Sequence, residues 1–232
     1  MAASTAALRG ITKQYKDFTL GPVDMTVPAG SIVGLIGENG AGKTTLLKIL
    51  CGVNRADDGT VDLLGGSPAD AATRAKIGVV FEDAFFYGSF TAAQVARSLA
   101  GMYGARWNAD SFSAYLRRFG LDAGKKLKEY SRGMRLKLSL AAALAHDPEL
   151  LVLDEATAGL DPVVRGALLD PFLEFIQDER HSIVMSSHIT ADLEQIADSI
   201  AYLHNGQLLF QENKDDLLQE YGVLHCGEDV LT

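Results

Sequence analysis

A glycine-rich segment at residues 37–45 carries the residue types that bind phosphate. It reads Gly-Glu-Asn-Gly-Ala-Gly-Lys-Thr-Thr, fits the pattern G-x-x-x-x-G-K-[ST] and directly follows an apolar run at residues 31–36. A strand that turns through glycines into a helix points unpaired N–H groups and a positive partial charge at one place. We therefore predict a phosphate-binding loop; a glycine-rich turn without a ligand is the alternative.

The side chains of this loop predict how a nucleotide is held. Lys43 is expected to reach the β- and γ-phosphates of ATP, and the hydroxyl of Thr44 to bind Mg²⁺. Glycine lets the phosphates approach the backbone without a Cβ atom in the way. The predicted nucleotide-binding residues of the loop are Gly37, Glu38, Asn39, Gly40, Ala41, Gly42, Lys43, Thr44 and Thr45.

Two adjacent acids end a second apolar run, at residues 150–153. Asp154 is expected to hold Mg²⁺ through a water molecule beside Thr44, and Glu155, one residue further, is expected to face an attacking water. Two acids at such a strand end favour hydrolysis over transfer to a bound acceptor. A solvated acidic strand end is the alternative, and the phosphate-binding loop upstream argues against it.

Composition limits the possible partners. The net charge is −9, which argues against sequence-independent nucleic-acid binding, and 47% hydrophobic residues are ample for a core. The two cysteines, Cys51 and Cys226, are typical of thiols in a reducing compartment. No stretch approaches the roughly 20 apolar residues that span a bilayer, so we expect any membrane role to depend on a partner.

The remaining pattern predicts the elements that position these residues. Residues 8–36 indicate strands, and Asn205-Gly206 between two apolar runs indicates a hairpin. Apolar residues recur at helical spacing over 91–146, which indicates an inserted helical subdomain. The predicted division is one domain over 1–232, with core and β subdomain at 1–90 and 147–215, helical subdomain at 91–146 and tail at 216–232.

Two further segments complete a familiar set of motifs. Residues 156–162 read Ala-Thr-Ala-Gly-Leu-Asp-Pro, and residues 130–135 read Tyr-Ser-Arg-Gly-Met-Arg. With the loop and the two acids, and in this order, they make the chain resemble the ATP-binding subunit of an ATP-binding cassette (ABC) transporter over roughly residues 8–210. The resemblance implies an α/β fold: a RecA-like P-loop core, an antiparallel β subdomain and a helical signalling subdomain.

The resemblance also assigns roles to matching positions. It implies that Tyr15 stacks on adenine, that His188 contacts the γ-phosphate, and that Asp161 couples the two sites of a dimer. Ser131 and Gly133 match the signature loop, which binds the nucleotide on the opposing subunit. The alternatives are a tyrosine on a half-exposed strand, a surface histidine, and an ordinary helix cap at Ser131.

Two positions depart from the common family pattern. Glu82 stands where the family usually has glutamine after the strand at 77–81; we predict that it ligates Mg²⁺ and acts near the attacking water. The signature Ser-Arg-Gly-Met at residues 131–134 resembles the subgroup serving type 2 bacterial exporters. The aromatic run Phe85-Phe86-Tyr87 is either core or a docking patch for the permease.

The resemblance implies an ATP-hydrolysing subunit, with Glu155, His188, Lys43 and Glu82 in catalysis. Two copies, or this chain and a paralogous subunit, would close head to tail over two ATP molecules with Mg²⁺. They would drive a separate transmembrane permease from the cytoplasmic face of the membrane, and the resemblance to type 2 exporter subunits implies that this permease is an exporter. The alternatives are an ABC ATPase not coupled to transport and a regulatory ATP-binding module.

Overall fold

The computed structural model describes residues 4–81, 86–158 and 160–220 of the chain. Its strands are β1 Ser4–Gln14, β2 Thr19–Pro28, β3 Ile32–Ile36, β4 Asp58–Leu63, β5 Ile77–Val80, β6 Leu150–Asp154, β7 Ser182–Ser187, β8 Ser199–His204 and β9 Gln207–Asn213. Its α-helices are α1 Lys43–Leu50, α2 Ala71–Arg74, α3 Ala92–Tyr103, α4 Ala109–Arg118, α5 Arg132–Leu144, α6 Pro162–Phe175, α7 Thr190–Ile196 and α8 Lys214–Glu220. Short 3₁₀ turns lie at Gly104–Arg106, between α3 and α4, and at Leu127–Glu129, between α4 and α5.

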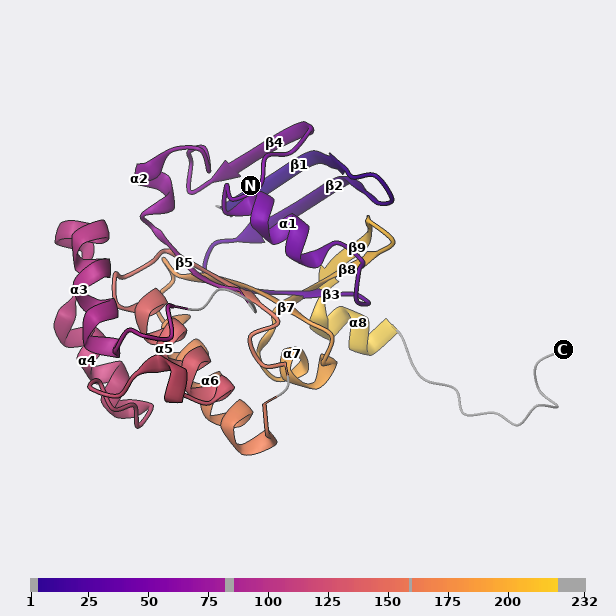
Figure 1. Cartoon of the computed structure of the whole chain (residues 1–232). Helices are drawn as coiled ribbons and strands as arrows, with labels where there is room; N and C mark the ends of the chain where they lie inside the picture. The colour runs from indigo at the N-terminus through magenta and orange to yellow at the C-terminus, as the bar shows by residue number, and fades with distance from the viewer. Residues whose placement is uncertain (1–3, 82–85, 159, 221–232) are drawn as a thin grey trace, which may run out of the picture.

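The strands form two sheets that enclose helix α1 (Figure 1). The smaller sheet is antiparallel, in the order β2-β1-β4, and the larger has the order β5-β6-β7-β3-β8-β9. In the larger sheet all neighbouring strands are parallel except β8 and β9. Strands β6, β7 and β3 are direct neighbours, so their carboxyl ends meet at one edge, where ligands bind in sheets of this kind.

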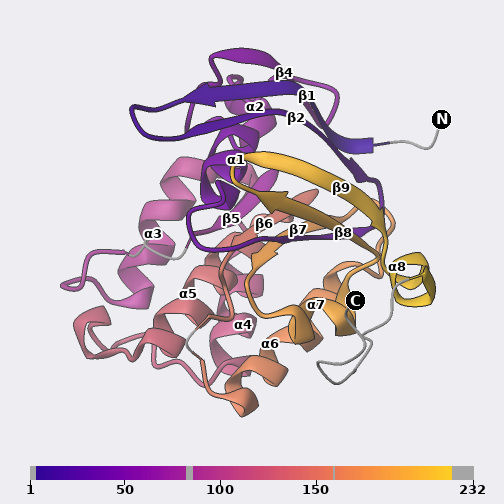
Figure 2. The same ribbon diagram turned by 90° about the vertical axis from the view of Figure 1, so that its right-hand side faces the viewer.

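The apolar residues of the parallel strands alternate between two cores. Val33 and Val152 belong to the core shared with α1 and the small sheet, whereas Leu151 and Met185 belong to the core beneath the helices. A parallel sheet covered on both faces needs such two-sided hydrophobic strands. Figure 2 shows the resulting layers: the small sheet, α1, the large sheet, and then α5, α6 and α7.

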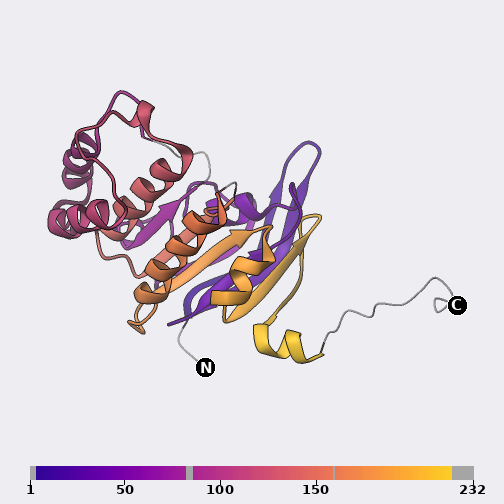
Figure 3. The ribbon, with the colours of Figure 1, turned by 90° about the horizontal axis from the view of Figure 1, so that it is seen from below.

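Helices make up the named elements between residues 92 and 144. Helix α3 begins with a capping box, in which Thr91 and Gln94 each satisfy the other's backbone N–H group. Helix α5 is buried over most of its length and contacts strand β5. Figure 3 shows α3 and α4 gathered to one side of the large sheet, while α6 crosses its face.

The predicted fold class is confirmed by this arrangement of parallel and antiparallel sheets with helices. The hairpin at Asn205-Gly206 joins β8 and β9 as expected. Strand β2 runs unbroken through Gly21-Pro22. The subdomain boundaries stay a prediction, and residues 221–232 of the predicted tail lie outside the described residues.

Candidate functional site

The loop between β3 and α1 is held by two glycines that no other residue could replace without strain. Gly42 is the N-cap of α1 and has a φ of 107°, in the region that favours glycine. At Gly37, where φ is 157°, a Cβ atom would overlap the carbonyl oxygen of Leu203 on β8. The loop is therefore fixed against the sheet while the first N–H groups of α1 remain available to phosphate.

Lys43 lies folded back along this loop. Its side chain is only 6% exposed, and Nζ donates hydrogen bonds to the carbonyl oxygens of Gly37 at 2.7 Å and Glu38 at 3.2 Å. Nζ also lies 3.2 Å from Oε1 of Glu155. The loop lysine and the predicted catalytic carboxylate are thus direct neighbours, although 112 residues separate them in the chain.

A hydroxyl and a carboxylate meet next to this pair. Oγ1 of Thr44 donates to Oδ2 of Asp154 at 2.8 Å, and Asp154 is 1% exposed at the end of β6. Hydroxyl and carboxylate oxygens are the hard ligands that Mg²⁺ accepts, with phosphate and water oxygens filling its octahedral shell. These two residues therefore fit the predicted magnesium site.

Glu155 is held in an unusual backbone conformation. Its φ is 50°, a left-handed value that is uncommon for a residue other than glycine. Its N–H group donates to the carbonyl oxygen and to Oγ of Ser186, at 3.2 and 3.0 Å. Its Oε2 accepts a 2.7 Å hydrogen bond from Nδ1 of His188. Such local strain persists where surrounding contacts fix it, which is typical of active sites.

Ser186 belongs to this cluster, although the sequence argument did not single it out. It pairs with Asp154 in the register between β6 and β7, and its buried hydroxyl donates to Oδ1 of Asp154 at 2.7 Å. The same oxygen accepts from the N–H group of Glu155. One hydroxyl therefore orients both acids. The available signal was a serine pair, at 186–187, between the apolar run at 183–185 and His188.

The residues assigned to adenine and to the opposing subunit lie apart from this cluster. Tyr15 is 43% exposed in the turn between β1 and β2, and its ring lies 6.4 Å from that of Phe18. Ser131 is an exposed helix cap, with Oγ accepting from the N–H group of Met134 at 3.2 Å. Gly133 lies in the first turn of α5, and Asp161 is exposed just before α6. Among the described residues, no hydrogen bond or ion pair joins Tyr15 or Ser131 to Lys43, Asp154 or Glu155.

The predicted docking region borders an apolar groove. Glu82 and Phe85 lie outside the described residues. Phe86 is half-buried and lines a groove of about 470 Å³, while Tyr87 is 77% exposed. Apolar side chains from β5, α3 and α5 form much of its wall. Cys51 also lines it; burial, and less strongly the charge of Asp154, raises the pKa of this thiol to about 12.

Comparison with known proteins decides the family. A family profile described as "ABC transporter" matches residues 20–158. The chain is an ABC transporter family member. It is 31% identical to the ABC transporter ATP-binding protein NatA of Bacillus subtilis over 206 residues, covering 85% of this chain and 82% of NatA. It is 35% identical to the bacitracin transport ATP-binding protein BcrA of Enterococcus faecalis over 212 residues, covering 89% and 68%.

One relative is considerably longer than this chain. The chain is 38% identical to an uncharacterized ABC transporter ATP-binding protein of Synechocystis, and the match covers 86% of this chain but only 58% of that protein. The structure of an ATP-binding subunit of an ABC transporter matches with a TM-score of 0.84 and 28% identity, covering 94% and 93%. A dimeric ATP-binding cassette with ADP and Pi matches at a TM-score of 0.80, but its 23% identity shows the fold alone.

These findings place the chain in the ABC transporter family, and the relatives and the structure at 28% identity are named as ATP-binding proteins or subunits. Within the described residues, no helix is long and apolar enough to cross a membrane.

Proposed function

We propose that this subunit hydrolyses ATP and drives a separate permease. The observation that carries the proposal is the position of Glu155, which contacts both Lys43 and His188 and adjoins the Thr44–Asp154 pair. A phosphate bound to Lys43 would therefore lie next to a carboxylate that can accept a proton from water. Positioning and electrostatic stabilisation are the main contributions to phosphoryl transfer.

In the proposed reaction the water oxygen bonds to the γ-phosphorus as the bond to the leaving ADP oxygen breaks. Glu155 accepts the proton, and His188 orients this carboxylate by donating from Nδ1. Lys43 stabilises the negative charge that develops on the phosphate oxygens. Thr44 and Asp154 would hold Mg²⁺, which neutralises phosphate charge; Glu82 stays a predicted additional ligand.

We further propose that the active form is a head-to-tail dimer with two ATP molecules. Exposure of Ser131 at the start of α5 supports this, because the loop offers N–H groups to a ligand that another subunit could supply. Tyr15, Gly133 and Asp161 keep their predicted roles at the adenine, the opposing phosphate and the dimer contact. A second copy or a paralogous subunit would complete each site; the acidic net charge of −9 leaves nucleic acid out of the proposed partners.

The groove beside Phe86 is the proposed docking site of the permease, which would hold the subunit at the cytoplasmic face of the membrane. Its apolar wall supports this, as does the neighbouring exposed Tyr87. Export is the proposed direction, supported by similarity to ATP-binding proteins named for bacitracin and lantibiotic transport. Changing Phe86 to Ser should lower permease-stimulated turnover and leave basal hydrolysis intact.

A turnover assay with and without membranes carrying the permease encoded beside this chain tests the proposal. We expect Mg²⁺-dependent ATP hydrolysis that rises when the permease is present. Hydrolysis that never responds to the permease would favour an ABC ATPase not coupled to transport. ATP binding without turnover would favour a regulatory module.

A further inference from the structure

A buried carboxylate lies on the helix that follows His188 and has no place in the proposed reaction. Asp192 is 2% exposed, in the first turn of α7. Its Oδ2 lies 3.8 Å from Nε of Arg165 on α6. Neither of these two atoms has a hydrogen-bond partner among the described residues. A buried charge is costly unless it is paired, so Arg165 is the group that compensates Asp192.

Arg165 also contacts the segment that follows Glu155. Its Nη2 donates to the carbonyl oxygen of Leu160 at 3.1 Å. Its backbone N–H group donates to the carbonyl oxygen of Asp161 at 3.0 Å. One guanidinium therefore connects the loop that precedes α6 to helix α7. The planar fork of arginine suits such a double role, because its donors have a fixed geometry.

The two connected segments each begin at a catalytic residue. Asp192 comes four residues after His188, and Leu160 comes five residues after Glu155. Nδ1 of His188 lies 2.7 Å from Oε2 of Glu155. Ser186, two residues before His188, also accepts a hydrogen bond from the N–H group of Glu155, so the two segments are connected where they begin. The Arg165–Asp192 pair is thus a link between the same two segments on the far side of the catalytic residues.

We propose that Arg165 and Asp192 are positioning residues, which fix the loop at Leu160 and Asp161 relative to α7 and so keep His188 and Glu155 in register. The proposal rests on the proposed ATP hydrolysis. The alternative is a purely structural role. The ion pair would then only stabilise the fold, or Asp192 would only stabilise the N-terminus of α7 through its negative charge. The apolar residues Leu193 and Ile196 bury the inner face of α7, whereas Arg165 contacts both α7 and the loop before α6.

Replacing the whole pair separates these roles. Exchange of a buried ion pair for apolar residues of similar size is often neutral for stability, whereas removal of one partner leaves an unpaired charge. We therefore expect Arg165→Met/Asp192→Leu to fold with a melting temperature close to that of the unchanged protein. Its kcat should fall by about tenfold while KM for ATP with Mg²⁺ changes by less than about threefold, as expected when positioning for the chemical step is lost.

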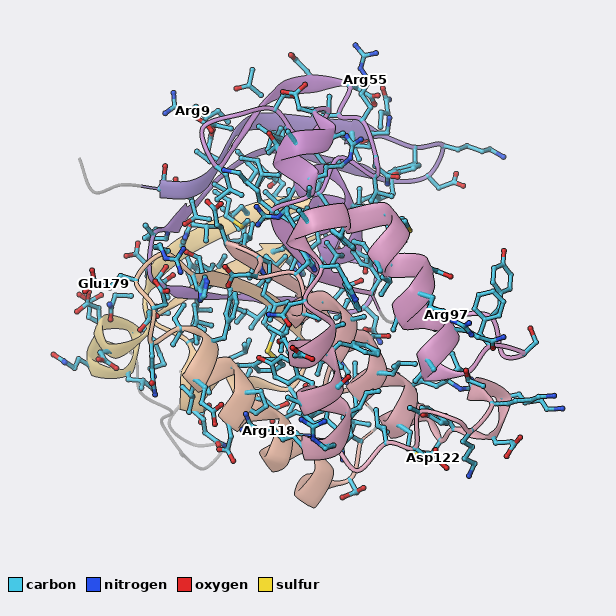
Figure 4. The ribbon with its side chains drawn as sticks, turned by 90° about the vertical axis from the view of Figure 1, so that its left-hand side faces the viewer. Arg9, Arg55, Arg97, Arg118, Asp122 and Glu179 are labelled. Carbon is cyan, nitrogen blue, oxygen red and sulfur yellow. The ribbon has the colours of Figure 1, made fainter. Side chains whose placement is uncertain are left out.

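A matched control is available on the same helix. Glu174 of α6 accepts from Nη2 of Arg118 at 2.7 Å, and both side chains are well exposed; Figure 4 labels Arg118 at the surface. Exposed pairs contribute little, so Glu174→Gln should keep kcat within about twofold. Arg165→Gln and Asp192→Asn, if folded, should each lose about as much as the double exchange, because each removes the same link.

Unchanged kcat in the folded Arg165→Met/Asp192→Leu protein would overturn the proposal. So would a loss of kcat that only matches the fraction unfolded at the assay temperature. Hydrogen exchange gives a second readout that does not need turnover: peptides covering 156–161 and 188–192 should exchange faster in the double variant, with the β3 peptide unchanged. Equal exchange rates of those two peptides in the double variant and the unchanged protein would also overturn the proposal. If the unchanged protein fails to hydrolyse ATP, the proposed function fails, and exchange alone then decides about the pair.

Discussion

Nζ of Lys43 lies 3.2 Å from Oε1 of Glu155, so the loop lysine and the acid after β6 form a partly buried ion pair. The same ammonium group binds two carbonyl oxygens of its own loop. A γ-phosphate that binds Lys43 must therefore share this cation with Glu155. This sharing brings the phosphate and the proposed proton acceptor together. Replacing Lys43 and replacing Glu155 should therefore have different effects on ATP binding and on hydrolysis.

Changing Lys43 to Ala should abolish tight ATP binding or turnover. The change removes the cation that faces the phosphates and also leaves Glu155 without its ion-pair partner. Isothermal titration with ATP and Mg²⁺, together with phosphate release, would measure both effects. Wild-type-like hydrolysis by this variant would refute the assignment of the loop.

Changing Glu155 to Gln should separate binding from hydrolysis. Glutamine keeps the shape but cannot accept the proton, so hydrolysis should fall about a hundredfold or more. ATP should bind at least as tightly as before, because Lys43 no longer shares its charge with a carboxylate. Light scattering at saturating ATP and Mg²⁺ should then show a dimer. A strict monomer under those conditions would contradict the head-to-tail arrangement.

The loop at Ser131 should act on the opposing subunit. Ser131→Arg is expected to leave ATP binding by the monomer nearly intact and to eliminate turnover, because it blocks the N–H groups at the start of α5. Mixing it with Lys43→Ala should restore partial, concentration-dependent activity, since a mixed dimer combines one intact loop of each kind. If Ser131→Arg weakens monomeric binding as much as Lys43→Ala does, the loop acts within one chain.

Ser186 should matter because it holds the two acids, although it has no predicted contact with ATP or Mg²⁺ itself. Ser186→Ala removes hydrogen bonds to Oδ1 of Asp154 and to the N–H group of Glu155. Loss of a hydrogen bond to a charged group costs about 1.5–3 kcal/mol, so we expect kcat to fall roughly tenfold to a hundredfold if the acids move. The Mg²⁺ concentration for half-maximal activity should rise. Ser199→Ala is the control, because Ser199 is a half-buried residue on β8 whose buried hydroxyl has no hydrogen-bond partner among the described residues; equal effects of the two changes would exclude a specific role.

The parts of the site that lie close together in sequence were predictable. Residue type and spacing predict the phosphate-binding loop at residues 37–45 and the two acids Asp154 and Glu155, because a loop, a helix start and a strand end are local features. Two-sided apolar runs at residues 150–153 and 183–185 likewise predict parallel strands. These local signals are sufficient to predict the fold class and the family.

The contacts between distant segments were not predictable. Ser186 meets Asp154 only because β7 lies between β6 and β3, and strand order is a property of the whole sheet. The pairing of Lys43 with Glu155 depends on the same order. Arg165 and Asp192 carry no motif, and their relation appears only when α6 and α7 pack together. Strand β2 continues through Gly21-Pro22, because Leu20 and Val23 on either side of these residues both pair with β1.

Acid should destabilise the protein partly through His146. This histidine is 1% exposed, its Nε2 donates to the carbonyl oxygen of Ile77 at 3.1 Å, and its ring stacks on Tyr103 at 4.1 Å. Burial lowers the pKa of His146 below its usual 6.5, an effect that outweighs the hydrogen bond to Ile77. The unfolded chain therefore binds more protons than the folded one once the pH falls below the unfolded-state pKa.

The sign of the effect follows from this difference. The free energy of unfolding should fall as the pH drops through 6.5, by up to about 1.4 kcal/mol from this residue at pH 5.5. His146→Gln cannot take up the proton, so the difference in unfolding free energy between pH 7.5 and 5.5 should be smaller in this variant. Urea unfolding at both pH values measures it, with His204→Gln, at a half-buried histidine on β8, as the control. Equal pH dependence in His146→Gln and the unchanged protein would show that burial does not hold His146 neutral.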